Sequence, residues 1–359
     1  MKKLLLAGGG HSHIQVMKRL EREPMDDVEI TLVSPSKYQY YPELFSGYIE
    51  DRYTKEEIRV DLERAAKEAG VIWKKGAILS IDPVQKLALT AGGEILDFDL
   101  LSIDIGSMTS GTDKTPLTED IYTIKPNYQF TASIDAIRLA DNLVITGANR
   151  AAVEIGSSLQ SWRMQNGLHN SLTLISPNKL LSDKMTPNAS AKIVQLLTEK
   201  GIELHLGSEI QAIRENKILL PQQEIHFDKM LWAQDPKAPD LFKLSKLPVD
   251  HNGFLLIENT LQVKKYPFIF GTGECAVMEG MRPYSHSFYT SIKQGNVLYT
   301  NIKGFLGTGE GELYTGHIPK LSPLELGRYH GLAVFNNRTF HGKIPWLLRQ
   351  LENKRLLKN

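Results

Sequence analysis

The amino-acid sequence predicts an α/β fold that contains the same arrangement of strand, glycine turn and helix twice. In the first copy the apolar strand KLLLA runs into Gly8, Gly9 and Gly10, a helical pattern follows, and a second apolar strand, VEITLV, spans 28–33. In the second copy NLVIT, a turn at Gly147, a helical stretch and SLTLIS follow one another over 142–176. A chain of 359 residues is long enough for two or more domains.

The composition excludes several classes of protein. Lys plus Arg number 42 and Asp plus Glu number 41, so the net charge of +1 gives no field that would hold the chain on nucleic acid. The single cysteine, Cys275, excludes an internal disulfide and a Cys-x-x-Cys redox or zinc site. The apolar run before the glycines is too short for a signal peptide, and no stretch approaches the roughly 18 apolar residues of a membrane-spanning helix. We therefore expect a cytoplasmic protein that binds no nucleic acid.

The first turn carries two of the three glycines of the Gly-x-Gly-x-x-Gly pattern, Gly8 and Gly10, and has His13 at the third position. In such a turn the first two glycines let the backbone approach a pyrophosphate, and the third allows the helix to pack closely on the strand. The turn therefore keeps its phosphate-facing glycines. The alternative is a glycine turn in some other α/β protein. His11 and His13 lack nearby cysteines or well-spaced carboxylates, so we expect no metal site.

The second turn departs further from the pattern. Gly147 is present, but Asn149 replaces the second glycine and Ala152 replaces the third, with Glu154 just inside the helix. A side chain at Asn149 stands where a pyrophosphate would contact the backbone. This copy therefore keeps the fold signature better than the binding signature.

Neither copy ends its second strand with the acid that would bind a ribose 2′-hydroxyl. The first copy has Ser34 at this place and the second has Ser176. A serine offers a single hydroxyl in place of a carboxylate. Lys179 nearby favours either a 2′-phosphate or a solvated surface position.

Further patterns predict the remaining elements. We expect a charged helix over 54–70, a strand that ends at a glycine turn around Gly106, and a crossover linker over 123–130. A helix around 189–200 and three or four strands follow, and a buried-type strand over 268–271 leads to another turn at Gly273 beside Glu274. A helix over 287–306 comes directly after it.

The C-terminal stretch over 342–359 predicts a basic amphipathic helix. Its apolar residues recur at helical spacing beside a tryptophan, and five basic residues face one acid: Ile344, Leu347, Leu348 and Leu351 with Trp346, and Lys343, Arg349, Lys354, Arg355 and Lys358 against Glu352. Such a helix either lies on an anionic bilayer, on the inner face of the cell membrane, or docks on its own protein or on a second subunit of a homodimer.

The motifs GGGHSH, TLVSPSKYQYYPELFSG, LLSIDIGS, KMLWAQD, FIFGTGECA and SIKQGNVLYTNI, in this order, resemble the pyridine nucleotide-disulphide oxidoreductase superfamily. Within it the chain is most similar to the type II, NADH dehydrogenase-like branch, which includes the flavoprotein domain fused to selenophosphate synthetase in some organisms. The resemblance implies two Rossmann-like dinucleotide-binding domains of the three-layer ββα type, the second inserted into the first. The expected boundaries are 1–125 with 246–310 for FAD, 126–245 for NAD(P), and 311–359 for a small C-terminal segment.

The resemblance also implies the cofactor-binding residues. Those expected to bind FAD are Gly8, Gly10, His11, Ser12, Ser34, Pro42, Ile78, Gly106, Gly273, Glu274 and Lys293, with Glu274 in place of the family's aspartate. Those expected at the NAD(P) site are Gly147, Asn149, Glu154 and Ser176, and Glu154 resembles the family's acid near the nicotinamide.

The activity implied is that of an FAD-dependent oxidoreductase that takes hydride from NAD(P)H and reduces a quinone or another small acceptor. Related enzymes pass electrons through a pair of redox cysteines, which a chain with only Cys275 cannot do. The flavin itself supplies the chemistry, so no catalytic acid or base is assigned. The alternative is an FAD-binding protein with a degenerate nicotinamide site, which senses redox state or depends on a partner.

Overall fold

The structure is a computed structural model that describes residues 1–113, 118–181, 185–279, 288–307, 309–316, 321, 323–336 and 338–357. The chain forms two compact units. Unit 1 comprises Met1–Gln39, Val60–Met108 and Pro236–Ile318, and unit 2 comprises Tyr40–Arg59, Thr109–Asp235 and Pro319–Asn359. The domain boundaries expected from the sequence assign 40–59 and 109–125 to the first domain, and they stay a prediction.

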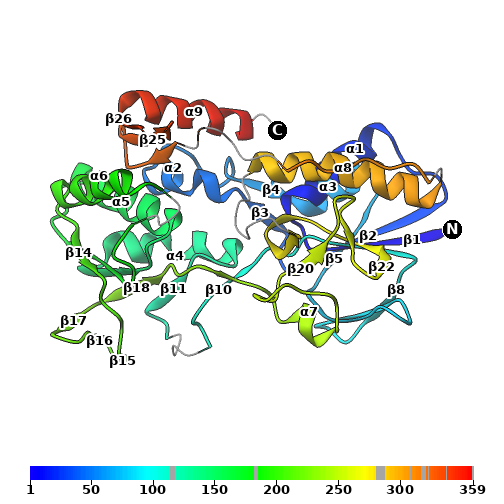
Figure 1. Cartoon of the computed structure of the whole chain (residues 1–359), viewed down its shortest axis with the longest axis horizontal. Coiled ribbons are helices and arrows are strands. Elements are labelled where there is room, and N and C mark those ends of the chain that lie inside the picture. The colour runs from blue at the N-terminus through cyan, green and yellow to red at the C-terminus, as the bar shows by residue number, and fades with distance from the viewer. Residues whose placement is uncertain are drawn as a thin grey trace. The chain divides into compact units, whose positions relative to one another are not determined.

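Unit 1 is built on an eight-stranded sheet in the order β23-β20-β21-β22-β9-β1-β2-β5. Figure 1 labels β1, β2, β5, β20 and β22 of this sheet. β1 pairs in parallel with β2 and β9, so that Leu4 lies opposite Ile30 and Leu100. These central strands read as continuous apolar runs because both faces of the sheet are covered. The strands are β1 (Lys2–Ala7), β2 (Val28–Ser34), β5 (Ile72–Lys75), β9 (Leu100–Ile103), β20 (Leu255–Ile257), β21 (Gln262–Val263), β22 (Tyr266–Gly271) and β23 (Ala276–Met278).

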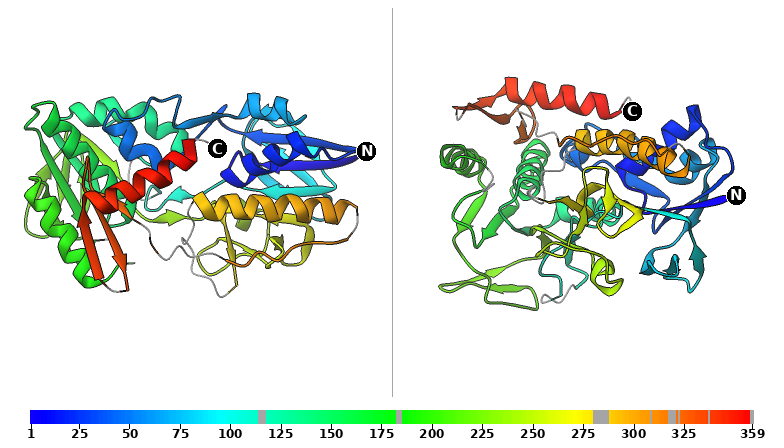
Figure 2. Two further views of the ribbon diagram at one scale, coloured as in Figure 1. Left: turned by 90° about the horizontal axis from the view of Figure 1, so that it is seen from above. Right: turned by 45° about the vertical axis from the view of Figure 1, so that its right-hand side comes forward.

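Helices α1 and α8 of unit 1 lie against each other beside this sheet (Figure 2). Gly295 allows this approach, because a Cβ atom there would lie 2.5 Å from Cβ of Gln15. A three-stranded sheet, β6-β7-β8, adds a further layer. The elements are α1 (His11–Arg22), α3 (Leu62–Glu68), α7 (Leu241–Leu244), η2 (Gly273–Cys275), α8 (Phe288–Leu306), β6 (Ile78–Asp82), β7 (Leu87–Thr90) and β8 (Ile95–Asp97).

Unit 2 is built on a five-stranded parallel sheet in the order β11-β18-β12-β13-β14. Val144 on β12 lies opposite Thr173 and Met230 on the two neighbouring strands. The strands are β11 (Ile121–Thr123), β12 (Asn142–Thr146), β13 (Ser171–Ser176), β14 (Glu203–Leu206) and β18 (Lys229–Trp232). The helices are η1 (Pro42–Leu44), α2 (Phe45–Ile49), α4 (Asn127–Leu139), α5 (Arg150–Gln165), α6 (Pro187–Glu199) and α9 (Lys343–Leu357).

Two small sheets complete unit 2, and four short strands remain. The sheets are β15 (Ala212–Arg214), β16 (Lys217–Leu219) and β17 (Glu224–His226), and β24 (Leu324–Glu325), β25 (Gly331–Phe335) and β26 (Arg338–Gly342). The short strands are β3 (Tyr38–Tyr40), β4 (Arg59–Asp61), β10 (Met108–Thr109) and β19 (Pro236–Lys237).

Two expected elements are wrong in extent. The helix expected over 54–70 spans only Leu62–Glu68, because Asp61 caps its first turn by accepting from the backbone N–H of Arg64 at 3.0 Å, and Arg59–Asp61 is a strand. The stretch expected to be a linker over 123–130 already contains the start of α4 at Asn127. The proline that suggested a linker lies one residue before that helix, where proline is tolerated.

Candidate functional site

The first glycine turn joins β1 to α1 in unit 1 and requires glycine at its first position. Gly8 has a φ of +94°, and a Cβ atom there would lie 2.3 Å from the carbonyl oxygen of Asp104. The same carbonyl oxygen accepts a hydrogen bond from the backbone N–H of Gly10 at 3.1 Å. The turn is therefore fixed against the end of β9.

The side chain of Asp104 occupies the inside of this turn. Its Oδ2 accepts hydrogen bonds from the backbone N–H of Ser12 at 2.9 Å and of His13 at 3.4 Å, so a buried carboxylate caps α1. A Cβ atom on Gly10 or on Gly273 would lie within 2.2 Å of this carboxylate. Asp104 is not among the residues predicted from the sequence, although it directly follows the apolar strand LLSI and could have been found by that position.

His13 ties the turn to β9. Its Nδ1 lies 2.6 Å from the carbonyl oxygen of Gly8 and its Nε2 lies 2.8 Å from Oγ of Ser102. Burial lowers the pKa of His13, so the ring is neutral near pH 7. A carbonyl can only accept, so Nδ1 donates to Gly8 and Nε2 accepts from the hydroxyl of Ser102. The imidazole thus fills the place of the third glycine.

The third predicted turn lies next to the first. Gly273 donates its backbone N–H to Oε1 of Gln294 at 3.0 Å, and Ser107 donates its hydroxyl to Oε2 of Glu274 at 3.0 Å. Gly106 has a φ of +69° and no atom within 4 Å of a Cβ position, so space is open beside it.

The other residues predicted to bind FAD are more dispersed. Ser34 lies at the end of β2, where its Oγ would be 3.2 Å from a Cβ atom on Gly9, and it donates to the carbonyl of Ser36. His11 is the first residue of α1. Ile78 begins β6, Lys293 is exposed on α8, and Pro42 begins η1 in unit 2.

The residues around the first turn fit a bound dinucleotide such as FAD. The hydroxyls of Ser12 and Thr272 are fully buried and have no hydrogen-bond partner among the described residues. Both flank the cluster formed by Gly8, Gly10 and Gly273. Buried polar groups without a partner cost free energy, and a polar ligand would supply one.

The second glycine turn, between β12 and α5, is closed by its own side chain. Gly147 has a φ of +128°, and a Cβ atom there would lie 2.2 Å from the carbonyl oxygen of Ala233. Asn149 accepts from the N–H of Ala152 at 3.0 Å and donates to the carbonyl of Ala233 at 2.9 Å and to Asp235 at 3.3 Å. Asn149 therefore caps α5 itself.

Glu154 lies in a buried group of charges in unit 2. Its Oε1 accepts from Arg150 and from the backbone N–H of Glu325, both at 2.9 Å. Burial opposes its ionisation, but Arg150 and Arg349 outweigh this and hold the pKa of Glu154 below its ordinary value. The structure therefore places Glu154 against the C-terminal segment. Its expected position near a nicotinamide stays a prediction.

Two more acids, Glu50 and Glu325, belong to this group. Arg52 binds Glu50 at 3.0 Å and also pairs with Glu325. Burial raises the pKa of Glu50 to about 7 and raises that of Glu325. Oε1 of Glu50 and Oε2 of Glu325 have no hydrogen-bond partner among the described residues.

The C-terminal helix α9 packs on β24, β25 and β26 by a mixed face that buries Pro345, Arg349, Asn353 and Leu356. Arg349 and Asn353 are buried there, and Arg349 donates to the carbonyl of Glu43 at 3.4 Å. The opposite face is apolar and lies 36% to 73% exposed, and it consists of Ile344, Leu347, Leu348 and Leu351. We call these four residues the α9 apolar stripe. The α9 apolar stripe therefore remains exposed although α9 packs on its own unit.

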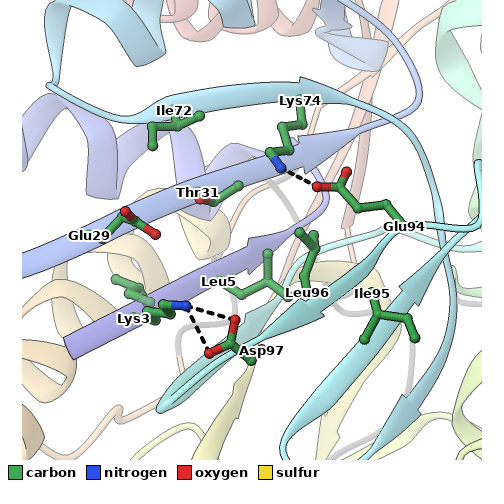
Figure 3. Close-up of a pocket in the computed structure, with 11 residues that line it drawn as sticks. Lys3, Leu5, Glu29, Thr31, Ile72, Lys74, Glu94, Ile95, Leu96 and Asp97 are labelled. Carbon is green, nitrogen blue, oxygen red and sulfur yellow. Dashed lines mark hydrogen bonds and ion pairs between the residues drawn. The ribbon is translucent and has the colours of Figure 1, made fainter. Parts of the chain in front are cut away.

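A pocket elsewhere in unit 1 does not belong to this site. Figure 3 shows that it is lined from β1, β2, β5 and β8, and it contains none of the predicted residues. Both of its lysines are already paired, Lys3 with Asp97 at 2.8 Å and Lys74 with Glu94. It lies beside the early residues of β1, whereas dinucleotides bind beyond the carboxyl ends of parallel strands.

The described residues offer neither redox cysteines nor a metal centre. Cys275 is buried, and its burial raises the pKa of the thiol. No group of three or more His, Cys, Asp or Glu side chains among the described residues is arranged to hold a metal ion. In the same part of the chain no helix is long and apolar enough to cross a membrane.

Comparison with known proteins places the chain in a family. The model of the family described as pyridine nucleotide-disulphide oxidoreductase matches residues 2–295. A type II NADH:quinone oxidoreductase of Staphylococcus saprophyticus is 23% identical and aligns over 99% of this chain and 94% of its own. An NADH dehydrogenase-like protein of Bacillus subtilis is 22% identical over 97% of each chain. The sulfide:quinone oxidoreductase structure from Aquifex aeolicus has the same fold, with a TM-score of 0.76 at 16% identity over 99% of this chain and 91% of that one. The chain belongs to the pyridine nucleotide-disulphide oxidoreductase family.

Proposed function

We propose that this chain passes electrons from NAD(P)H through FAD to a quinone. Its family makes it an FAD-dependent oxidoreductase of NAD(P)H. The finer statement, a quinone acceptor, is supported by the relatives named for quinone reduction. The observation that carries the proposal is the first glycine turn combined with a single buried cysteine. That turn fits a dinucleotide, and electrons cannot leave through a disulfide.

The chain's own residues would bind and orient the cofactor. We propose that the backbone at Gly8 and Gly10 and the start of α1 at His11 and Ser12 meet the pyrophosphate of FAD, where the helix N-terminus favours an anion. The remaining predicted residues are proposed to contact the rest of FAD: Ser34, Pro42, Ile78, Gly106, Gly273, Glu274 and Lys293. Gly147, Asn149, Glu154 and Ser176 are proposed for NAD(P)H. Bound FAD would supply the hydride acceptor and the electron donor.

The test is an anaerobic titration of the purified protein. We expect a yellow protein whose flavin band at about 450 nm bleaches on addition of NADPH or NADH and returns on addition of a soluble quinone. A protein without bound flavin contradicts the proposal. A yellow protein that neither nucleotide bleaches supports the second candidate, a flavoprotein without a working nicotinamide site. The cap that Asn149 places on α5 favours that candidate.

We further propose that the protein binds the inner face of the cell membrane through the α9 apolar stripe. Support comes from the outward position of Ile344, Leu347, Leu348 and Leu351 and from exposed Lys343 and Lys354 on the same helix. Apolar residues flanked by basic ones suit an anionic lipid surface.

Flotation with vesicles of phosphatidylglycerol tests this proposal. We expect the wild type to float with the vesicles and the double variant L348S/L351S to stay behind. The variant L244S is the control, because Leu244 is 72% exposed on α7 and lies outside the stripe. A wild type that does not float contradicts membrane binding. If light scattering then shows a dimer that L348S/L351S dissociates, a second copy of the chain covers the stripe.

A further inference from the structure

The loop that follows β13 in unit 2 holds a place where nucleotide specificity is decided. In a strand, turn, helix and strand unit of this kind, an acid at the end of the second strand binds the ribose 2′-hydroxyl of NADH, whereas a nearby cation accommodates the 2′-phosphate of NADPH. β13 ends at Ser176, and Pro177, Asn178 and Lys179 follow. None of residues 176–179 carries a carboxylate.

The hydroxyl of Ser176 is already used within the loop. Ser176 is fully buried, and its Oγ accepts a hydrogen bond from the backbone N–H of Asn178 at 3.0 Å. A buried hydroxyl engaged by its own loop does not substitute for a ribose-binding acid. Ser176 supplies no carboxylate, so the choice between the two nucleotides falls to the residues beyond it.

Lys179 is held in position by the loop after β14. The carbonyls of Asn178 and Ser176 accept from the N–H groups of Gly207 at 3.1 Å and of Ser208 at 2.9 Å. The stem of Lys179 lies over Gly207, where a Cβ atom would be 3.2 Å from its Cγ. The side chain is exposed, and its ammonium has no hydrogen-bond or ion-pair partner within the described ranges. A cation with a packed stem and a free head remains at the strand end.

We infer that Lys179 selects NADPH over NADH by pairing with the 2′-phosphate of the nucleotide. This inference rests on the proposed function, because it names the donor of the same reaction. A lysine ammonium donates a charge-assisted hydrogen bond to a phosphate oxygen, and such a bond is stronger than one between neutral groups. Since no acid offsets it by favouring a free 2′-hydroxyl, we expect about a 10-fold preference for the phosphorylated nucleotide.

Calorimetric titration with two adenine nucleotides tests the inference without the flavin reaction. The wild type is expected to bind 2′,5′-ADP about 10-fold more tightly than 5′-AMP, which lacks only the 2′-phosphate. The variant K179Q should lose this preference, and K179R should keep it. The matched control is K192Q, because Lys192 is a partly exposed lysine on α6 that bonds only to Gln195 among the contacts described. Equal binding of the two nucleotides by the wild type overturns the inference, and so does a preference that survives in K179Q.

Flavin bleaching by NADPH and NADH separates this inference from the proposed function. If neither nucleotide bleaches the flavin but K179Q abolishes the preference for 2′,5′-ADP, the role of Lys179 stands and hydride transfer falls. If both nucleotides bleach the flavin at equal rates in the wild type and in K179Q, hydride transfer stands and the role of Lys179 falls. If the protein binds neither adenine nucleotide, both fall.

Discussion

Gly8 in unit 1 and Gly147 in unit 2 both have a positive φ, and both face a carbonyl oxygen at the end of a neighbouring strand. The two turns differ in what caps the helix behind them. In unit 1 the cap is the carboxylate of Asp104, which directly follows β9, whereas in unit 2 it is the amide of Asn149, which belongs to the turn. The first cap comes from a distant part of the chain, and the second comes from the turn itself. The same backbone geometry is thus combined with two different ways of satisfying the first N–H groups of the helix.

The largest effects are expected from alanine at the two glycines. G8A and G147A each force a Cβ atom into a carbonyl oxygen, at 2.3 Å and 2.2 Å, and each should lower the free energy of unfolding by about 2–4 kcal/mol. G8A should also lose bound flavin, whereas G147A should retain it. Chemical denaturation and the absorbance ratio of flavin to protein measure both results. G70A is the control, because Gly70 has a φ of +70° and open space around it. Equal flavin loss in G8A and G147A would remove the functional distinction between the turns.

A second contrast concerns buried acids, because Asp104 is hydrogen-bonded in its site while Glu50 keeps an oxygen without a partner. The folded chain raises the pKa of Glu50 from 4.5 to about 7. The folded state therefore binds this proton more tightly than the unfolded state does. Its contribution to stability is fully present below pH 4.5 and is lost as the pH rises through 7. We expect E50Q to remove about 2–3 kcal/mol of pH dependence between pH 5 and pH 8.

Unfolding curves at several pH values measure that dependence. Arg52, Glu325 and Lys200 surround Glu50, and burial lowers the pKa of Lys200 to about 8, so its own contribution rises with pH above 8. Because the pKa values of His13 and Glu325 are shifted as well, Glu50 is read from the difference between the wild-type and E50Q profiles up to pH 7.5. The variant E199Q alters an exposed acid on α6 and should leave the pH profile unchanged. A profile for E50Q that matches the wild type would mean that folding does not raise the pKa of Glu50.

A smaller loss of stability is expected when the third glycine of the pattern is restored. H13G removes the hydrogen bonds to the carbonyl of Gly8 and the hydroxyl of Ser102 and should cost about 1–3 kcal/mol. Thermal unfolding measures the change. S102A, which removes only one of these bonds, should cost less than H13G. If H13G is as stable as the wild type, the imidazole does not hold the turn to β9.

The smallest loss of stability is expected when the side-chain cap that Asn149 places on α5 is removed. N149A leaves the N–H of Ala152 without its acceptor and should cost about 1 kcal/mol. N149G costs only a few tenths at such a position and opens the turn. If Asn149 limits access of the nucleotide, N149G should bind NADPH more tightly than N149A does, as fluorescence titration would show. Equal affinities would mean that the cap does not obstruct the cradle.

The sequence was sufficient for the fold class, the family and the kind of enzyme, which are confirmed. Periodic apolar strands and glycine turns are local patterns, so they are readable without the structure. The roles of Asp104 and His13 were missed because each depends on β9 lying beside β1, about 90 residues away in the chain. The charge group around Glu154 was missed for the same reason, since Glu325 comes from the C-terminal segment. The binding residues for FAD and NAD(P)H stay predictions.

The imidazole of His13 also bears on how such chains are found. A pattern search that demands glycine at the third position of the turn passes over this protein, although its turn is built and held in place. The pair that replaces the glycine is separated in sequence: a histidine five residues after the first glycine and a serine on the strand beside it. A search for that pair would find chains in which hydrogen bonds from an imidazole, instead of close packing of helix on strand, hold the nucleotide-binding turn in place.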